Sequence, residues 1–246
     1  MTATKVAVIT GGGSGIGRAA ALGFAGAGYK TAICGRRTEA LEAVSAETGG
    51  YWGQCDVTDP AEVAKFFAGV KAEFGQIDVV FNNAGRSAPA VSFGDVDVVT
   101  WRDMIDTNLN GAFYVAREAF RIMRDQTPQG GRIINNGSIS ADVPRPGAAA
   151  YNASKHAITG LTKTISLDGR AFNIACGQID IGNAATDMTS KMSGGVLQAN
   201  GTIMPEPRMD VVNVVDGLLY MAGLPLSANV QFMTVMATTM PYIGRG

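Results

Sequence analysis

Short apolar runs alternate along this chain with longer segments in which apolar residues recur at helical spacing. The runs are rich in β-branched and aromatic side chains, which favour strands. They cover residues 6–10, 30–34, 51–55, 77–81, 132–136 and 173–178. Several lack polar alternation, which is typical of strands buried on both faces of a sheet. Repeated strand, helix and strand predict βαβ units, and hence a doubly wound α/β fold with a parallel sheet and helices on both faces.

Two helical segments carry start signals of their own. Before residues 60–74, Asp59 can cap the first turn, and Pro60 suits the first helical position. In residues 38–48, Glu39 lies in the first turn, where a negative charge favours the helix dipole. We therefore expect helices over both segments and over residues 151–167, which share the helical spacing.

Residues 183–210 break this alternation. Met188, Met192, Met204 and Met209 lie there among glycine, proline and threonine. Two interpretations stay open: a mobile lid over an apolar ligand, or a loop whose methionines fill gaps in the core.

The glycine-rich turn after the first expected strand is typical of a phosphate-binding site. Its sequence is TGGGSGIGRA, and a helix is expected to begin near Ile16. Glycine permits a tight turn and close backbone approach, and free N–H groups at a helix start attract a pyrophosphate. The spacing differs from G-x-G-x-x-G, and no Gly-Lys-Ser/Thr follows, which disfavours a P-loop NTPase. A plain turn is the alternative. The residues expected to contact a nucleotide are Gly11, Ser14, Gly15, Ile16 and Gly17.

The end of the second expected strand bears on the type of nucleotide. An acidic residue there would suit a free ribose 2′-hydroxyl, whereas this chain has Arg36 and Arg37. Arginines can bind a 2′-phosphate through charge-assisted hydrogen bonds. The pair predicts NADP(H) in preference to NAD(H), although NAD(H) stays possible and two solvated arginines are the alternative.

Composition narrows the remaining classes of function. The net charge is -1 and no basic cluster stands out, so nothing indicates binding to nucleic acid or to a membrane surface. No stretch reaches the ~18 apolar residues of a membrane span. Cys34, Cys55 and Cys176 form no C-x-x-C pair, which favours a reducing compartment, and a single His156 makes a metal site implausible. We expect a soluble cytoplasmic protein with a small-molecule partner and no metal.

Tyr151 and Lys155 lie four residues apart on one face of an expected helix. Because a nearby ammonium stabilises a phenolate, Tyr151 is a candidate proton donor. The pair is a weak signal alone, but further motifs accompany it in order. These are Thr10-Gly11-x-x-x-Gly15-x-Gly17, Asp56-Val57, Asn82-Asn83-Ala84-Gly85, Asn108, Ser138 and Tyr151-x-x-x-Lys155. Together they resemble the short-chain dehydrogenase/reductase superfamily, from residue 6 to about 186.

The resemblance implies a single Rossmann-type domain over residues 1–246, with a nicotinamide cofactor and hydride transfer between a carbonyl and an alcohol. Tyr151 would be the general acid and base, and Ser138 would polarise the substrate oxygen. Lys155 would bind the nicotinamide ribose, and Asn108 would bind a water in a proton relay.

The resemblance also implies further cofactor contacts. Asp56 and Val57 would meet the adenine, and Thr186 the carboxamide. The adenosine side would be lined by Asn82, Asn83, Ala84 and Gly85. After the sixth strand the family usually has Pro-Gly, and this chain has Cys176-Gly177. Gly177 and Ile179 are therefore among the expected contacts. Thr186 follows this dipeptide at a longer distance than is usual in the family.

We therefore expect an oxidoreductase that uses NADP(H) on a small to medium carbonyl or alcohol. An NAD(H)-linked enzyme and a catalytically silent nucleotide sensor or scaffold are the alternatives. Substrate walls are expected from residues 86–99, 139–147 and the lid at 183–210, whose apolar residues favour an uncharged or partly apolar substrate. The resemblance further implies a homotetramer or homodimer built through helices around 103–125 and 151–169.

Overall fold

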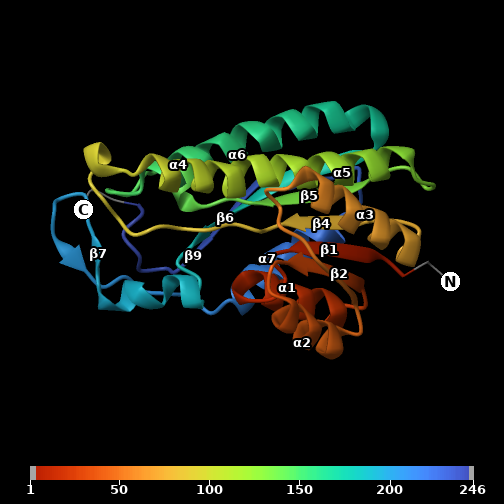
Figure 1. The fold of residues 1–246 in the computed structure, drawn as a ribbon, viewed down its shortest axis with the longest axis horizontal. Coiled ribbons are helices and arrows are strands. Elements are labelled where there is room, and N and C mark those ends of the chain that lie inside the picture. The colour runs from red at the N-terminus through yellow and green to blue at the C-terminus, as the bar shows by residue number, and fades with distance from the viewer. Residues whose placement is uncertain (1–3, 244–246) are drawn as a thin grey trace.

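Seven parallel strands form one sheet in the computed structural model, which describes residues 4–243 (Figure 1). The strands are β1 (Val6–Thr10), β2 (Lys30–Gly35), β3 (Tyr51–Gln54), β4 (Val79–Asn82), β5 (Gly131–Asn136), β6 (Ile174–Gly182) and β9 (Phe232–Met236). Their order is β3-β2-β1-β4-β5-β6-β9. The chain moves outward from β1 to β3 and then returns to β4 on the other side of β1. A ligand crevice is expected at this switch point, outside the carboxyl ends of the strands.

Helices cover both faces of the sheet, as the alternation predicts. One face carries α1 (Gly15–Gly26), α2 (Thr38–Thr48) and α7 (Val212–Gly223). The other carries α3 (Pro60–Phe74), α5 (Gly111–Asp125) and α6 (Ala149–Asp168). Short α4 (Val98–Ile105) and a π-helical turn (Asp106–Asn110) run into α5. Successive strand residues contribute to opposite cores: Val8 packs against α3 and α5, and Ile9 against α1 and α2.

The expected helices form, and Asp59 caps α3 through hydrogen bonds from the N–H groups of Ala61 (2.7 Å) and Glu62 (3.4 Å). Two strand predictions differ from the structure. β6 continues to Gly182, beyond the expected end at 178, because it remains paired with β5 and β9. The edge strand β9 is not among the predicted strands, although four of its five residues are apolar.

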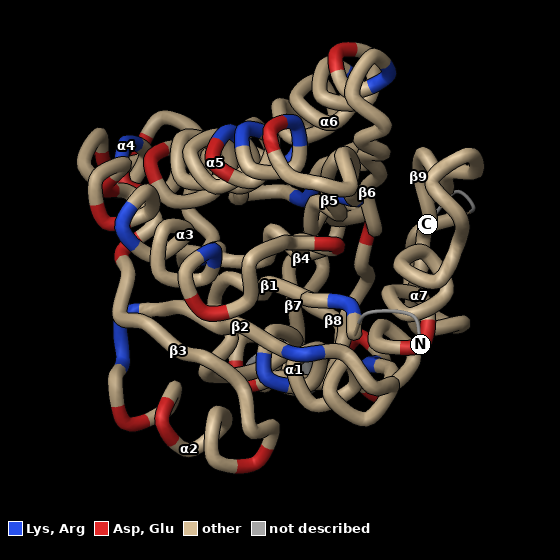
Figure 2. Tube along the Cα trace, turned by 90° about the vertical axis from the view of Figure 1, so that its right-hand side faces the viewer, with Lys and Arg blue, Asp and Glu red and all other residues tan. Residues whose placement is uncertain are grey.

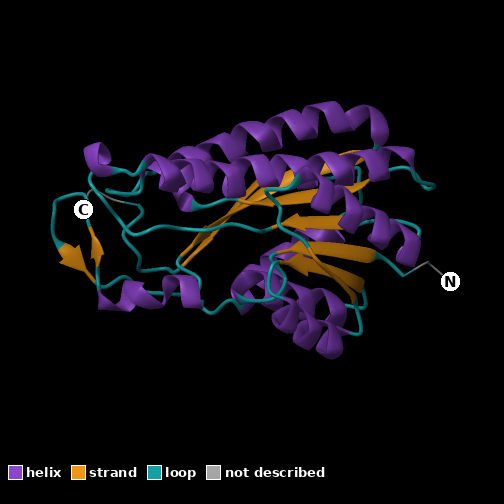
Figure 3. Cartoon of the chain, in the orientation of Figure 1, coloured by secondary structure: helices purple, strands orange, loops and turns teal. Residues whose placement is uncertain are grey.

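Loops gather at one end of the sheet, beyond the carboxyl ends of the strands (Figure 3). There the segment 183–210 forms a short turn, η5 (Asp187–Gly194), and a small hairpin of β7 (Val196–Leu197) and β8 (Ile203–Met204).

Residues of both signs lie close together along α5 (Figure 2), where Glu118 contacts Arg117 and Arg121. Within residues 4–243, none of the helices combines the length and apolar character that a bilayer crossing requires.

Candidate active site

The glycine-rich turn lies at the carboxyl end of β1, and its backbone requires glycine. Gly11 and Gly15 have φ angles of 66° and 53°, a region that favours residues without a Cβ. A Cβ on Gly17 would overlap the carbonyl oxygen of Gly11. The turn is tied to β2 by the N–H of Gly12, which donates to the carbonyl of Cys34 at 3.0 Å. The helix start, where Gly15 is exposed, suits a bound pyrophosphate because N–H groups at a helix start have no partner within the helix.

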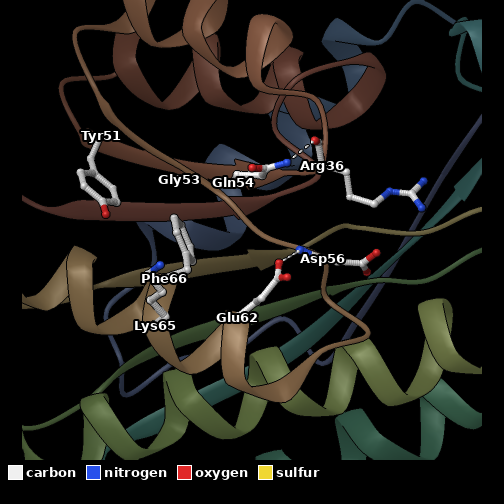
Figure 4. A pocket seen from close by; sticks show the side chains of 8 residues that line it. All are labelled: Arg36, Tyr51, Gly53, Gln54, Asp56, Glu62, Lys65 and Phe66. Atoms are coloured by element: carbon white, nitrogen blue, oxygen red, sulfur yellow. Dashed lines mark hydrogen bonds between the residues drawn. The ribbon is translucent and has the colours of Figure 1, made fainter.

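The two arginines after β2 lie in different surroundings. Arg37 Nη2 donates to the Oγ of Ser14, the N-cap residue of α1, at 2.7 Å. Arg36 and Asp56 extend to the same side beyond the strand ends (Figure 4). They line a cavity of about 590 Å³, together with Tyr51, Gly53, Gln54, Glu62, Lys65 and Phe66. Arg37 therefore lies next to the start of α1, and Arg36 lies in the cavity beyond the ends of β2 and β3.

Asp56 and Val57 follow β3 at the same edge of the sheet. Asp56 Oδ1 accepts hydrogen bonds from the N–H (3.0 Å) and hydroxyl (2.9 Å) of Thr58, and its own N–H donates to Glu62 Oε2 at 2.7 Å. The Val57 side chain is buried and packs so closely on Gly111 that a Cβ there would collide with it. Val57 can thus meet a nucleotide through its backbone alone.

Asn83, directly after β4, connects the ends of β1 and β5. Its side-chain nitrogen donates to the carbonyl of Thr10 at 2.8 Å, and its Oδ1 accepts from Asn136 Nδ2 at 2.8 Å. The N–H groups of Asn83 and Ala84 both donate to Thr10 Oγ1, at 2.9 Å. Gly85 follows within the same turn, close to Asn108.

Asn82 differs from the expectation that it lines the adenosine side. It is 4% exposed, and its amide donates to the carbonyl of Ala112 (2.8 Å) and to Asn135 Oδ1 (3.1 Å). That prediction is wrong, because the side chain points into the layer between the sheet and α5.

Ser138 lies just past β5 in an extended conformation, and two hydrogen bonds fix it. Its N–H donates to Asp180 Oδ1 at 2.9 Å, and its Oγ accepts the N–H of Ser140 at 3.1 Å. A hydroxyl that accepts one bond still has its proton to donate. Ser138 can therefore donate to a ligand oxygen.

Lys155 and Tyr151 lie on the first turns of α6, which packs against the turn that carries Ser138. Lys155 is 7% exposed and donates through Nζ to the carbonyl of Asn136 at 2.8 Å. The same nitrogen lies 5.6 Å from the centroid of the Tyr151 ring. An ammonium has three donors, so Lys155 can bind a ligand while it contacts Asn136. His156, the next residue, faces solvent, and its Nδ1 contacts the carbonyl of Asn152.

Asn108 lies in the π-helical turn before α5, and its side chain is engaged at both ends. Oδ1 accepts the N–H of Arg86 at 2.8 Å, and the amide donates to the Arg86 carbonyl (3.0 Å) and to Ser154 Oγ (3.3 Å). The side chain thus closes the loop after β4 onto α6. Its π-helical turn is itself notable, because single π-turns are common at functional sites.

Comparison with known proteins agrees with this geometry. The family model described as short chain dehydrogenase matches residues 5–195. The chain belongs to this family. It is therefore an NAD(P)-dependent oxidoreductase, with hydride transfer as its chemistry.

Named relatives span several substrates. A 3beta-hydroxysteroid dehydrogenase of Mediterraneibacter gnavus is 36% identical over 78% of this chain and 70% of its own length. Sulfoacetaldehyde reductase 2 of Chromohalobacter salexigens is 31% identical over 96% of this chain and 95% of its own. A solved actinorhodin polyketide ketoreductase with NADPH has 25% identity and a TM-score of 0.86, over 95% of this chain and 96% of that one.

Two expected cofactor contacts of this short-chain dehydrogenase are wrong. Ile179 is 0% exposed, in the middle of β6 between two paired strands, and Gly177 packs against Val230 and Met221. Because β6 continues to Gly182, the dipeptide at its carboxyl end is Ile181-Gly182. Thr186 is the fourth residue after this glycine.

Thr186 does lie at the glycine-rich turn. Its methyl group is 3.6 Å from the position of a Cβ on Gly15, and its N–H donates to Thr189 Oγ1 at 3.1 Å. The predicted contact with a carboxamide stays a prediction.

In this dehydrogenase a salt bridge and hydrogen bonds around Glu206 hold the segment 183–210. The sequence does not predict this cluster. Arg145 Nη1 donates to Glu206 Oε1 at 2.7 Å, and Nη2 donates to Oε2 and to Asn183 Oδ1. Gln198 Nε2 also donates to Glu206, at 3.0 Å. Burial raises the pKa of Glu206, but the hydrogen bonds from Arg145, Asn183 and Gln198 outweigh it and leave the pKa below its usual value. No sequence signal links a glutamate to an arginine 61 residues away.

The methionines of this segment differ in burial, which bears on whether they fill gaps in the core or are available to a ligand. Met209 packs into the core, as a gap filler would. Met188 and Met204 are 55% and 53% exposed. The side chain of Met192 lies outside the described residues.

Proposed function

We propose that the chain is an NADP(H)-dependent reductase or dehydrogenase of a small to medium carbonyl or alcohol. The observation that carries the proposal is the buried Lys155 ammonium beside the Tyr151 ring, on a helix that packs against the turn beginning at Ser138. A carbonyl that accepts hydride becomes an alkoxide, which requires an aimed donor and a proton source. Ser138 and Tyr151 would supply these two functions.

The residues divide the work as follows. NADPH, when bound, supplies the hydride to the carbonyl carbon. The Ser138 hydroxyl donates to the substrate oxygen, and the Tyr151 hydroxyl transfers its proton to that oxygen. Lys155 binds the ribose with the donors that Asn136 leaves and stabilises the phenolate that remains. The Asn108 carbonyl is proposed to bind the water through which Tyr151 regains its proton.

Arg36 and Arg37 support NADP(H) over NAD(H). A 2′-phosphate at the end of β2 would meet two guanidinium groups and the Ser14 hydroxyl, where NAD(H) would leave both cations unpaired. Structural relatives with 25% identity, the ketoreductase above and a serine dehydrogenase, contain NADPH and NADP+. The other proposed cofactor contacts are Gly11, Gly15, Ile16, Gly17, Asp56, the backbone of Val57, Asn83, Ala84, Gly85 and Thr186.

Turnover tests the proposal directly. Absorbance at 340 nm with NADPH and a panel of ketones, aldehydes and alcohols should detect activity, and Tyr151→Phe should lower kcat by at least about 10²-fold. Tyr220→Phe is the matched control, because Tyr220 is 59% exposed on α7. NADPH binding with no turnover across the panel would instead favour a sensor or scaffold.

Thermal shifts test the cofactor. NADPH should raise the melting temperature more than NADH does, and Arg36→Asp should reverse or abolish this preference. Arg170→Asp, an exposed arginine beyond α6, should leave it unchanged. An NADH preference in the wild-type protein would contradict the assignment.

We further infer one catalytic domain over residues 1–246 with residues 183–210 as its lid, an uncharged or partly apolar substrate, and a cytoplasmic location. A homotetramer or homodimer through α5 and α6 is supported by Phe113 and Leu167, which expose apolar side chains on these helices. Light scattering that finds only a monomer would contradict the assembly.

A further inference from the structure

A ladder of side-chain hydrogen bonds runs beneath α6 toward Ser138. Asn135 on β5 donates to Thr162 Oγ1 at 2.9 Å, and Thr162 donates to Gln178 Oε1 on β6 at 3.1 Å. Because the Gln178 carbonyl accepts there, its amide nitrogen points the other way and donates to Asp180 Oδ1 at 2.7 Å. Thr162 and Gln178 are both 0% exposed. Polar groups at such depth need partners, so the ladder fixes the orientation of Gln178.

The ladder ends on a carboxylate, which can only accept. Two donors converge on Asp180 Oδ1: the Gln178 amide and the N–H of Ser138, at 2.9 Å. Gly137 makes room for this oxygen, since a Cβ at that position would overlap it. Burial raises the pKa of Asp180, an effect that the hydrogen bonds from Gln178 and Ser138 and the charge of Lys155 reduce.

Ser138 is therefore fixed at two points, its N–H by Asp180 and its Oγ by the N–H of Ser140. We propose that Asp180 is a positioning residue, which orients Ser138 so that its hydroxyl meets the substrate oxygen. The inference rests on the proposed function of Ser138. Asp180 also lines a cavity of about 270 Å³, so water can partly replace a lost carboxylate.

The chain offers a matched control at the opposite end of the sheet. Asp78 Oδ2 accepts the backbone N–H of Val6 at 2.7 Å and the side-chain amide of Gln76 at 3.0 Å. These are the same two kinds of donor that Asp180 accepts. Asp78→Ala therefore removes equivalent hydrogen bonds from a strand far from Ser138.

The kinetic test compares Asp180→Ala, Asp180→Asn and Asp78→Ala at a temperature where all are folded. Asp180→Ala should lower kcat on the order of tenfold with little change in NADPH affinity, since a misplaced catalytic group loses rate rather than cofactor binding. Asp180→Asn retains an accepting oxygen and should recover most of kcat. Asp78→Ala should lose stability but keep kcat. Wild-type kcat in Asp180→Ala, or an Asp180→Asn as slow as Asp180→Ala, overturns the proposal.

Amide hydrogen exchange over residues 137–139 measures how firmly the backbone around Ser138 is held, and it does not depend on turnover. Exchange should rise on the order of tenfold in Asp180→Ala and remain slow in Asp180→Asn and Asp78→Ala. If exchange rises but the wild-type protein reduces no carbonyl, the proposed function fails while the positioning stands. If exchange does not change, Asp180 does not position Ser138. Should Asp180→Ala fail to fold, Gly137→Ala, which displaces the carboxylate, takes its place with the same expected exchange and kcat.

Discussion

The turn after β1 and the segment after β6 lie at the same edge of the sheet, yet different forces fix them. Positive φ angles and backbone contacts shape the glycine-rich turn, so it tolerates no Cβ at Gly17. The segment 183–210 is fixed by a cluster of side chains around Glu206. The glycine-rich turn is therefore shaped by its own backbone, whereas the segment 183–210 depends on charged side chains that can be removed one at a time.

The largest effect is expected in the glycine-rich turn. Gly17→Ala places a Cβ against the Gly11 carbonyl and Asn83, which should destabilise the fold by about 1–3 kcal/mol and weaken NADPH binding at least about tenfold. Gly26→Ala, at the end of the same helix, has no atom within 4 Å of its new Cβ and should cost nothing. Denaturation and NADPH titration check both. Equal stability and equal NADPH affinity in the two variants would contradict the requirement for glycine at position 17.

Removal of one charge should loosen the segment 183–210. Arg145→Met leaves the buried Glu206 without its cation, at a cost of about 1–3 kcal/mol, and should speed proteolysis after Arg208. Arg18→Met breaks an exposed pair with Glu47 and should cost less than about 1 kcal/mol. Equal resistance to protease in both variants would show that the charge cluster does not fix the segment 183–210.

Loss of the N-cap of α3 should have a smaller effect, on the free energy of unfolding alone. Asp59→Ala removes the acceptor for the first N–H groups of α3 and should cost about 1 kcal/mol in urea unfolding. Lid proteolysis should not change. A lid that opened with this variant would contradict the independence of the two regions.

The smallest expected effect is a pH dependence of stability that arises from Glu206 in the segment 183–210. The folded pKa of Glu206 is lowered, so its contribution is complete above its unfolded pKa of about 4.3 and is lost as pH falls through the lower folded value. Glu206→Gln should therefore reduce the loss of stability between pH 5 and 3 by under about 1 kcal/mol. Thermal melts at both pH values measure this, with Glu47→Gln as the exposed control. An unchanged pH profile would argue against an ionised Glu206.

The sequence predicts most of the fold because local chemistry specifies it. Buried apolar runs locate β1, β2, β4 and β5, and Asp59-Pro60 marks the start of α3. Position in the chain also brings Ser138, Tyr151 and Lys155 to one edge of the sheet, although their roles come from resemblance.

The errors arise where long-range pairing decides the structure. β6 is longer than predicted because Asp180 and Gln178, polar residues that suggest a strand end, are paired within the sheet and the ladder. That misplaced end put Gly177 and Ile179 at the cofactor. The Arg145–Glu206 contact depends on tertiary structure alone, so no local pattern predicts it.

A crystal structure with bound NADPH tests the central claim most directly. We expect Lys155 Nζ within hydrogen-bond distance of the nicotinamide ribose, the Tyr151 hydroxyl facing the nicotinamide ring, and Arg36 or Arg37 in contact with the 2′-phosphate. A dinucleotide bound at the glycine-rich turn with the Lys155 amine out of reach of both the ribose and the Tyr151 hydroxyl would contradict it.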